Sequence, residues 1–390
     1  MSRIFFGFVP ILLSVVATVT TAAQSSLNAS EARRVASVFD TKTSDSLKCS
    51  VTKRPPGLDF AFRYDAGYIL RCRVGDFEGK KNTLAIFARV TPTGRPPVVL
   101  GERIEIPEIT PKLIGGRDPA KLKTMFAVSG TFGVGEGDYL VEILAIDALH
   151  RTARKKWKLH VAANRSARQV PLALQPFSVE PMVRPASDLV AAPADGKIRL
   201  TVLLDAVPII PYQSYLRAWD RSFLLESLYS LLRETPYKSV RLVAFNIEQQ
   251  RVIYRQDRFD GAAFIGLARA MSGMETATVS VQSLEKRNSP EFLIDLVKTE
   301  LTEAEPPDAV VFLGPSARTW TGKVGGDLLP ARSANRPPIV YFKYFPWASS
   351  PFPDGIEQLT RALDGKTHLI RTPEDLGKSI KELLTQLKQE

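Results

Sequence analysis

The sequence predicts two folded domains of different classes: an N-terminal all-β sandwich and a C-terminal α/β domain with a doubly wound, mostly parallel sheet. Three observations lead to this prediction. Apolar residues recur at every second position between residues 47 and 163, prolines punctuate residues 164–196, and strand patterns alternate with helix patterns over 197–390. A chain of 390 residues is long enough for two domains, each with its own core.

Residues 1–23 have the pattern of a cleavable signal peptide, with Arg3 before an apolar stretch from Ile4 to Val19 and small residues at the expected cleavage point. The alternative is a membrane anchor, but the stretch is short and contains Pro10. We therefore expect a periplasmic or secreted protein that does not span the membrane after cleavage. The polar residues 24–46 that follow are compatible with a helix or with an unstructured lead-in.

The region 47–163 shows the alternation of half-buried strands. Runs such as Tyr68–Val74, Leu84–Val90 and Tyr139–Ala145 place an apolar side chain at every second position, and turn residues separate them. Short strands without helices between them predict an antiparallel sandwich. Cys49 and Cys72 both lie on such strands, so in an exported chain they predict one disulfide, which we expect to cross the core.

The formal net charge of +11 is spread along the chain, and its densest run is Arg151–Lys158. One interpretation is a patch that binds nucleic acid or another anionic polymer. The other is the solvated face of a strand, with Trp157 on one face and Lys156 and Lys158 on the opposite face. We favour the strand, because an exported protein rarely meets nucleic acid, and we expect no nucleic-acid partner.

Residues 164–196 contain prolines at irregular intervals, which predicts a semi-rigid linker. The α/β pattern of 197–390 follows. Ile198–Leu204 is almost entirely apolar, as a strand buried on both faces should be, and Trp219–Arg233 carries an apolar helical stripe. Thr372 begins a capping motif that predicts the start of the last helix.

The order of elements over 197–390, together with Val202-Leu203-Leu204-Asp205 and the stretch Gly365–Leu376, resembles a von Willebrand factor type A domain. The region before it looks like an immunoglobulin-type module. The resemblance implies a divalent cation at the carboxyl edge of the sheet, held partly by an Asp-x-Ser-x-Ser motif. Here the motif stands as Asp205-Ala206-Val207-Pro208-Ile209, so both serines are replaced by apolar residues, and no aspartate follows the fourth strand.

We therefore expect neither a bound metal nor a cofactor. Asp205 is then a vestigial position that caps a helix or accepts backbone hydrogen bonds.

Aromatic residues follow several strands at the edge where such a cation would lie. They are either a contact surface for a partner or rings that pack on one another, and the sequence does not separate these alternatives. The candidate partner-binding residues are Tyr212, Tyr215, Trp219, Trp320, Phe345, Trp347 and Phe352.

No catalytic motif accompanies these residues, so we expect a non-catalytic binding or scaffolding protein whose partner is an unidentified protein or envelope component. The alternatives are a hydrolase that uses Asp205 as its acid or base, and a structural component of an envelope assembly.

Overall fold

The computed structural model describes residues 25–27, 29–41, 46–77, 82–106, 124–182, 196–210, 213, 215–274, 290–302, 305–315, 336–345 and 354–388. The chain divides into two compact units. The first unit comprises residues up to Gly57, Asp65–Val161 and Pro176–Val183. The second comprises Leu58–Tyr64, Ala162–Gln175 and Arg184–Glu390.

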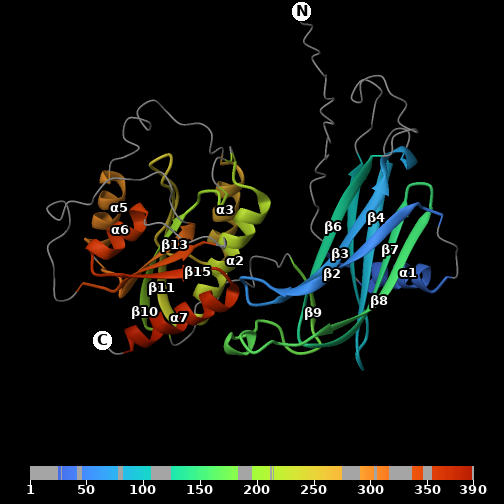
Figure 1. Cartoon of the computed structure of the whole chain (residues 1–390), viewed down its shortest axis with the longest axis horizontal. Helices are drawn as coiled ribbons and strands as arrows, with labels where there is room; N and C mark the ends of the chain where they lie inside the picture. The colour runs from blue at the N-terminus through green and yellow to red at the C-terminus, as the bar shows by residue number, and fades with distance from the viewer. Residues whose placement is uncertain are drawn as a thin grey trace, which may run out of the picture. The chain divides into compact units, whose positions relative to one another are not determined.

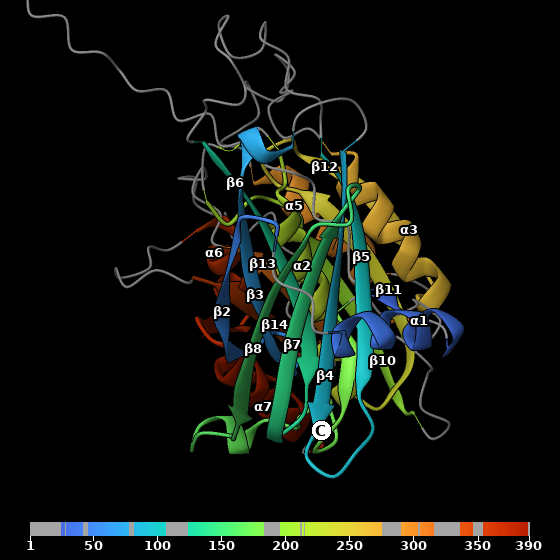
Figure 2. The same cartoon turned by 90° about the vertical axis from the view of Figure 1, so that its right-hand side faces the viewer.

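The first unit contains a five-stranded and a four-stranded β-sheet (Figures 1 and 2). The five-stranded sheet is antiparallel, and its strands in spatial order are β1 (Ser25–Ser26), β5 (Val98–Ile106), β4 (Asn82–Pro92), β7 (Gly137–Asp147) and β8 (Thr152–Val161). The four-stranded sheet has the order β2 (Cys49–Leu58), β3 (Tyr64–Arg73), β6 (Met125–Val134) and β9 (Val179–Pro181). A 3₁₀ turn, η1 (Val74–Asp76), follows β3.

The predicted alternation places apolar side chains in the core of this unit. Every second residue of Tyr68–Val74, Leu84–Val90 and Tyr139–Ala145 is buried, as expected for strands with one core face. A buried hydrogen bond of 2.9 Å from the Tyr68 hydroxyl to Glu102 Oε1 joins strands of the two sheets. Gly130 allows this arrangement, because a Cβ at that position would lie 2.3 Å from the Tyr68 ring.

The expected disulfide between Cys49 and Cys72 is present, but its expected course was wrong. Cys49 begins β2 and Cys72 lies on β3, and these strands are neighbours in one sheet, with the two Cα atoms 4.3 Å apart. The bridge therefore links adjacent strands instead of crossing between the sheets. The alternation of apolar residues identified the strands, but it carries no information on which strands pair.

The polar lead-in contains helix α1 (Ala29–Asp40), which lies beside the five-stranded sheet (Figure 2). Asp40 forms an ion pair of 2.8 Å with Arg89 of β4, and the Arg89 guanidinium also lies over the Phe39 ring. Arg154 of β8 donates to the carbonyl groups of Val38 and Thr41. Of the two possibilities for residues 24–46, the structure therefore shows a helix.

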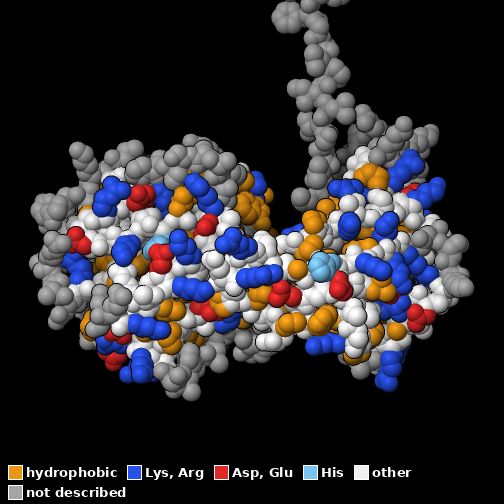
Figure 3. Space-filling model, turned by 60° about the horizontal axis from the view of Figure 1, so that its bottom comes forward, with side chains coloured by type: hydrophobic (Ala, Val, Ile, Leu, Met, Phe, Trp, Pro, Cys, Tyr) orange, Lys and Arg blue, Asp and Glu red, His pale blue; other side chains and the backbone are white. Residues whose placement is uncertain are grey.

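The basic run on β8 is the solvated face of a strand. Lys156, Lys158 and His160 are exposed, whereas Leu159 and Val161 on the opposite face are buried and Trp157 is half-buried. Across the face shown in Figure 3, lysine and arginine side chains are interspersed with acidic ones and are not gathered into one patch. The distribution of charge follows the alternation of the strands.

The second unit is built on a six-stranded mixed sheet. Its order is β12 (Arg251–Gln256), β11 (Tyr237–Asn246), β10 (Ile198–Asp205), β13 (Ala309–Pro315), β14 (Ile339–Tyr344) and β15 (Lys366–Ile370). All neighbouring pairs are parallel except β11 and β12. Parallel strands of this kind are buried on both faces, and every residue of β13 and β14 is buried.

Helices cover both faces of this sheet (Figure 1). The helices are α2 (Ala218–Glu234), α3 (Gly261–Ser272), α5 (Glu291–Leu301), α6 (Gly355–Ala362) and α7 (Pro373–Leu387). Residues of α2, α3 and α7 share a core with Leu200, Val202 and Leu204 of β10. Residues of α5 and α6 pack on the opposite face with Leu203. The predicted capping motif of α7 is present, because Thr372 Oγ1 accepts from the backbone N–H of Asp375.

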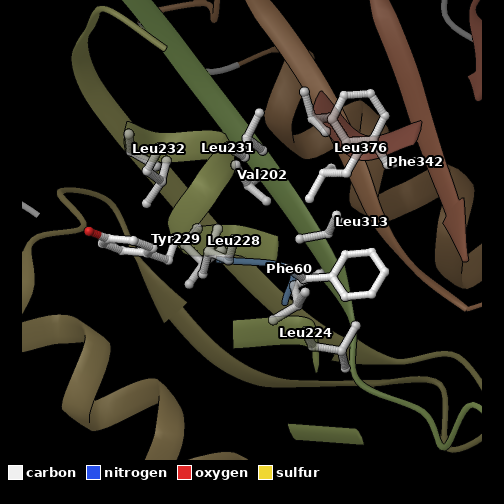
Figure 4. Packing of buried hydrophobic residues seen from close by; sticks show 14 of the residues in the cluster. Phe60, Val202, Leu224, Leu228, Tyr229, Leu231, Leu232, Leu313, Phe342 and Leu376 are labelled. Carbon is white, nitrogen blue, oxygen red and sulfur yellow. The ribbon is translucent and has the colours of Figure 1, made fainter. Parts of the chain in front are cut away.

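The turn between β2 and β3 belongs to the second unit and not to the sandwich. Phe60 and Phe62 lie in the core of that unit with residues of α2, and Figure 4 shows Phe60 among Leu224, Leu228 and Leu313. The hydroxyl of Ser230 donates a buried bond of 2.6 Å to the Phe60 carbonyl oxygen. The expected assignment of this turn to the sandwich over residues 47–163 was therefore wrong. No local pattern in the sequence marks a loop that packs into the core of another unit.

Residues 162–182 are folded into the two units and do not form a separate linker. Ala162–Gln175 clusters with the second unit and includes the 3₁₀ turn η4 (Ala167–Gln169), whereas Pro176–Val183 clusters with the first and includes β9. Within the second unit, the Ala173 N–H donates to the Phe62 carbonyl oxygen at 2.8 Å. Val170 lies against Gly377 of α7. The spacing of the prolines excludes a long helix in this segment, but it does not prevent the segment from packing against a folded unit.

Among the described residues, no helix is long and apolar enough to cross a bilayer. The longest of them, α2, has 17 residues, whereas a transmembrane helix needs about 20 apolar residues. The expected signal peptide at 1–23 lies outside the described residues.

Candidate functional site

The carboxyl ends of β10, β13 and β14 meet at one edge of the six-stranded sheet, where ligands of open α/β sheets usually bind. Asp205 is the last residue of β10 and is fully buried. The neighbouring strand approaches it closely at Gly314, where a Cβ would lie 2.8 Å from the Cβ of Asp205. Glycine at this position therefore leaves the space that the Asp205 side chain occupies.

Asp205 is a buried carboxyl group held by a hydrogen bond from the backbone. Its Oδ1 accepts a hydrogen bond of 3.2 Å from the N–H of Ile247, which is one of the two roles expected for it. Its Oδ2 is buried and has no hydrogen-bond partner among the described residues. Burial raises the pKa of Asp205 well above its usual range, the Ile247 N–H opposes this rise, and the charges of Glu248 and Asp354 add to it.

A buried lysine lies on β14 at the same edge. Lys343 is 1% exposed, and its Nζ is 3.0 Å from Asp354 Oδ2 and 2.7 Å from Glu357 Oε2. Asp354 is itself fully buried and caps α6, because its Oδ1 accepts from the Glu357 N–H at 2.9 Å. The ammonium group thus compensates two carboxylates and ties the start of α6 to the sheet.

Tyr341, two residues before Lys343, completes this cluster. Its hydroxyl donates a bond of 2.9 Å to the carbonyl oxygen of Pro315 at the end of β13. Burial raises the pKa of Tyr341 well above its usual range, and the carboxylate of Asp354 adds to the rise. We call Asp205, Tyr341, Lys343, Asp354 and Glu357 the edge cluster.

A third buried carboxyl group, that of Asp220, organises the segment after β10. Asp220 lies in the first turn of α2, and its two oxygens accept from the N–H groups of Ile209 at 3.1 Å and Arg217 at 3.0 Å. Burial raises the pKa of Asp220, whereas these two bonds lower it. The side chain therefore closes the loop onto its own helix and is not directed at a ligand.

The candidate partner-binding aromatics separate into three groups. Tyr215 and Trp219, on either side of the start of α2, are 56% and 41% exposed. Phe345 is 3% exposed, and its N–H bonds to the Ile370 carbonyl, so it is a core residue and does not belong to a contact surface. The remaining candidates lie outside the described residues; they are Tyr212, Trp320, Trp347 and Phe352.

Sequence reasoning identified Asp205 but missed the lysine and its carboxylate partners. One signal was available, because Lys343 interrupts an otherwise apolar strand, Ile339–Tyr344. A lysine in such a strand needs a buried counter-charge. The sequence does not say that Asp354 and Glu357 supply it, since that pairing depends on how α6 packs.

Lys343, Asp354, Glu357 and Tyr341 of the edge cluster have polar partners, whereas Asp205 Oδ2 has none among the described residues. Among the residues described, no three His, Cys, Asp or Glu side chains are arranged to hold a metal ion. No titratable side chain among the described residues forms a hydrogen bond with Asp205. Lys343 forms ion pairs with two carboxylates, those of Asp354 and Glu357. The ion pairs of Lys343 tie the start of α6 to the edge of the sheet.

Comparison with known proteins does not assign a family to the chain. No family model and no curated protein matches it. Solved structures with partial similarity include a putative superoxide reductase from Thermotoga maritima, with 12% identity over 30% of this chain and 86% of that one and a TM-score of 0.21. A lipoprotein from Bacteroides thetaiotaomicron has 9% identity over 32% of this chain and 89% of that one, with a TM-score of 0.17. A putative β-galactosidase from Bacteroides fragilis has 10% identity over 87% of this chain and 52% of that one, with a TM-score of 0.19. These scores are too low to establish a common fold.

Proposed function

We propose that this chain is an exported, non-catalytic binding or scaffolding protein. Its second unit would be a metal-free domain similar to von Willebrand factor type A, and its partner a protein or another component of the cell envelope. The observation that carries the proposal is the setting of Asp205, a fully buried carboxyl group that accepts a backbone hydrogen bond at the edge where the resemblance implies a cation.

The topology of the second unit supports the resemblance. Numbered within the unit, the strands lie in the order 3-2-1-4-5-6, which is typical of a doubly wound sheet. Helices cover both faces, and Asp205 ends the first and central strand. This is the position at which the resemblance implies the first metal ligand.

The chemistry of Asp205 argues against a cation at that position. Hard divalent cations are bound by several oxygen ligands, of which carboxylates contribute in the ionised form. Burial raises the pKa of Asp205 and so disfavours the ionised form, and its Oδ1 already accepts a hydrogen bond from the Ile247 N–H. Ala206, Val207 and Ile209 follow it, and their side chains offer no oxygen.

Tyr215 and Trp219 support a contact role near the same edge. Large aromatic side chains supply much of the binding energy at protein interfaces. Both side chains are more than two-fifths exposed, although neither is needed to fill the core of the unit. We infer that these two residues form part of the surface that contacts the partner.

Export is supported by the disulfide. A bridge between Cys49 and Cys72 would persist in an oxidising compartment and would be reduced in the cytoplasm. The pattern of residues 1–23 agrees with this location.

Calorimetric titration with Mg²⁺, Mn²⁺ and Ca²⁺ tests the metal-free character. We expect no saturable one-site binding to the mature protein and the same result for Asp205→Ala. One-site binding that Asp205→Ala abolishes would overturn the proposal.

Affinity capture from the native envelope or secreted fraction tests the contact surface. We expect Trp219→Ala and Tyr215→Ala to weaken capture of a specific component without lowering the melting temperature. Ile265→Ala is the matched control, because Ile265 is 49% exposed in the same unit and lies on α3. If the three variants capture equally, Tyr215 and Trp219 are not the contact surface.

A further inference from the structure

The register of the first unit arranges the outward side chains of β4, β7 and β8 in rows across the sheet. In one row Arg89 lies beside Glu142 and Glu142 beside Lys156. The Glu142 carboxylate binds both cations, with an Arg89 Nε–Oε2 distance of 2.7 Å and a Lys156 Nζ–Oε1 distance of 3.0 Å. This row contains its own counter-charge.

The next row has no carboxylate. The same register places Thr91 beside Leu140 and Leu140 beside Lys158. Lys158 is exposed and forms no ion pair with any residue that the structure describes. An acidic side chain of the neighbouring strand β7, that of Asp138, lies with its Oδ1 2.8 Å from His160 Nδ1 and lines the same cavity as Lys158. Among the described residues Lys158 therefore has no ion-pair partner, whereas Lys156 pairs with Glu142.

A second cation, Arg95, lies at the end of the same surface. Arg95 belongs to the turn after β4, in which Gly94 has a φ of +74° and the Arg95 N–H donates to the Pro92 carbonyl at 3.2 Å. The guanidinium lies 5.6 Å from the centre of the Phe177 ring, and its Nη1 donates to the Phe177 carbonyl at 3.5 Å. These contacts restrict the side chain and leave its other N–H groups for a ligand.

Lys158, Arg95 and Thr91 line one concave surface. The cavity has a volume of about 690 Å³ and is bounded by the end of β4, by residues 138–140 of β7 and by residues 158–160 of β8. It therefore brings the Lys158 ammonium, the restricted Arg95 guanidinium and the Thr91 hydroxyl together within a single unit, with the exposed carboxylate of Asp138 also on its lining.

We propose that this cavity binds an oxyanion, the phosphate or carboxylate group of a ligand. Lysine contributes a point charge, arginine a planar set of donors that matches two anionic oxygens, and threonine a hydroxyl donor. Both cations are exposed, so binding is weakened by salt and is modest for an isolated ion. The site lies in the first unit and does not depend on the function proposed for the second.

Calorimetry of the mature protein with inorganic phosphate, and separately with citrate, tests the site at an ionic strength held constant with sodium chloride. The variants are Lys158→Ala and Arg95→Ala. The matched control is Lys156→Ala, which removes the same charge from the same face of the same strand, two residues away. We expect saturable binding that either of the first two substitutions weakens by about fivefold, with little change for the control.

Tighter binding of phosphate than of citrate would assign the site to phosphorylated ligands, and the reverse to carboxylated ones. The proposal is overturned if neither anion gives a saturable signal beyond that of chloride. It is also overturned if Lys156→Ala weakens binding as much as Lys158→Ala, since the interaction would then reflect net charge alone. Unchanged melting temperatures of all three variants establish that the comparison concerns folded protein.

Discussion

Replacing Asp205 by asparagine should make the second unit more stable at neutral pH, and the gain should grow as the pH rises. Asparagine is neutral and nearly isosteric, and its side-chain oxygen can still accept the bond that Ile247 donates to Asp205 Oδ1. The substitution therefore removes the ionisable group while it retains the shape and the hydrogen bond. A metal ligand at this position would show the opposite behaviour, because the bound cation would be lost.

The sign follows from the raised pKa of Asp205 in the folded state. Below the usual aspartate pKa, about 3.9, the carboxyl group is protonated in both states and contributes no pH dependence. Above that value the unfolded chain releases its proton while the folded chain keeps it. The free energy of unfolding therefore falls by about 1.4 kcal/mol per pH unit, until the pH reaches the folded pKa. The asparagine variant lacks this loss, so the difference in the free energy of unfolding between the two proteins should grow as the pH rises through that window.

Urea unfolding followed by the helical circular dichroism signal measures this difference, since most described helices belong to the second unit. Curves for the wild type and for Asp205→Asn should be recorded at several values between about pH 5 and pH 7. Subtracting the two free energies of unfolding at each pH cancels the contributions of groups that titrate equally in both proteins. Asp205→Ala is a useful third protein. It should show the same pH dependence with a constant loss of about 1–3 kcal/mol, because the Ile247 N–H becomes unsatisfied.

A difference between wild type and Asp205→Asn that is independent of pH would refute the reasoning, because it would mean that Asp205 titrates alike in both states. A loss of stability of Asp205→Asn relative to the wild type that grows as the pH rises would contradict it more strongly. That result would indicate an ionised carboxylate with a favourable partner, such as a cation.

Three further substitutions test other parts of the structure. Phe62→Ala should lower the free energy of unfolding of the second unit by about 3–5 kcal/mol, because the ring is fully buried there; a loss below about 1 kcal/mol in urea unfolding would remove the turn from that core. Lys343→Met should cost about 3 kcal/mol or more, since it leaves Asp354 as an uncompensated buried carboxylate; an unchanged urea midpoint would contradict this ion cluster. Reducing the bridge between Cys49 and Cys72, or replacing both by serine, should destabilise the first unit by about 3 kcal/mol in thermal unfolding, and an equal melting temperature would show that the link adds no stability.

Local patterns were sufficient for most elements of both units. Alternation located the strands around Leu70, Ile86 and Ile143, because a strand with one buried face must repeat every second residue. The predicted helix at Trp219–Arg233 corresponds to α2, Ala218–Glu234, and its apolar stripe faces the sheet. These features depend on neighbours within a few residues, and the sequence displays them directly.

The candidate site was predictable only in part, because several of its contacts join residues that are far apart in the sequence. The apolar residues Ala206, Val207 and Ile209 after Asp205 are visible in the sequence, and the structure adds that the carboxyl group is buried and bonded to the Ile247 N–H. The partners of Lys343 come from α6, beyond the end of its own strand. The burial of Phe345 likewise depends on contacts from distant parts of the chain and not on its neighbours.

By itself the sequence determined the two classes of fold, the existence of a disulfide and the absence of serine oxygens beside Asp205. Only the tertiary structure decided that the disulfide joins adjacent strands, that the turn with Phe62 fills the core of the second unit, and that Lys158 lacks the carboxylate that Lys156 has. The physical reason is that periodicity and residue chemistry are local properties. Strand pairing, register and the core that receives a loop depend on residues far apart in the chain.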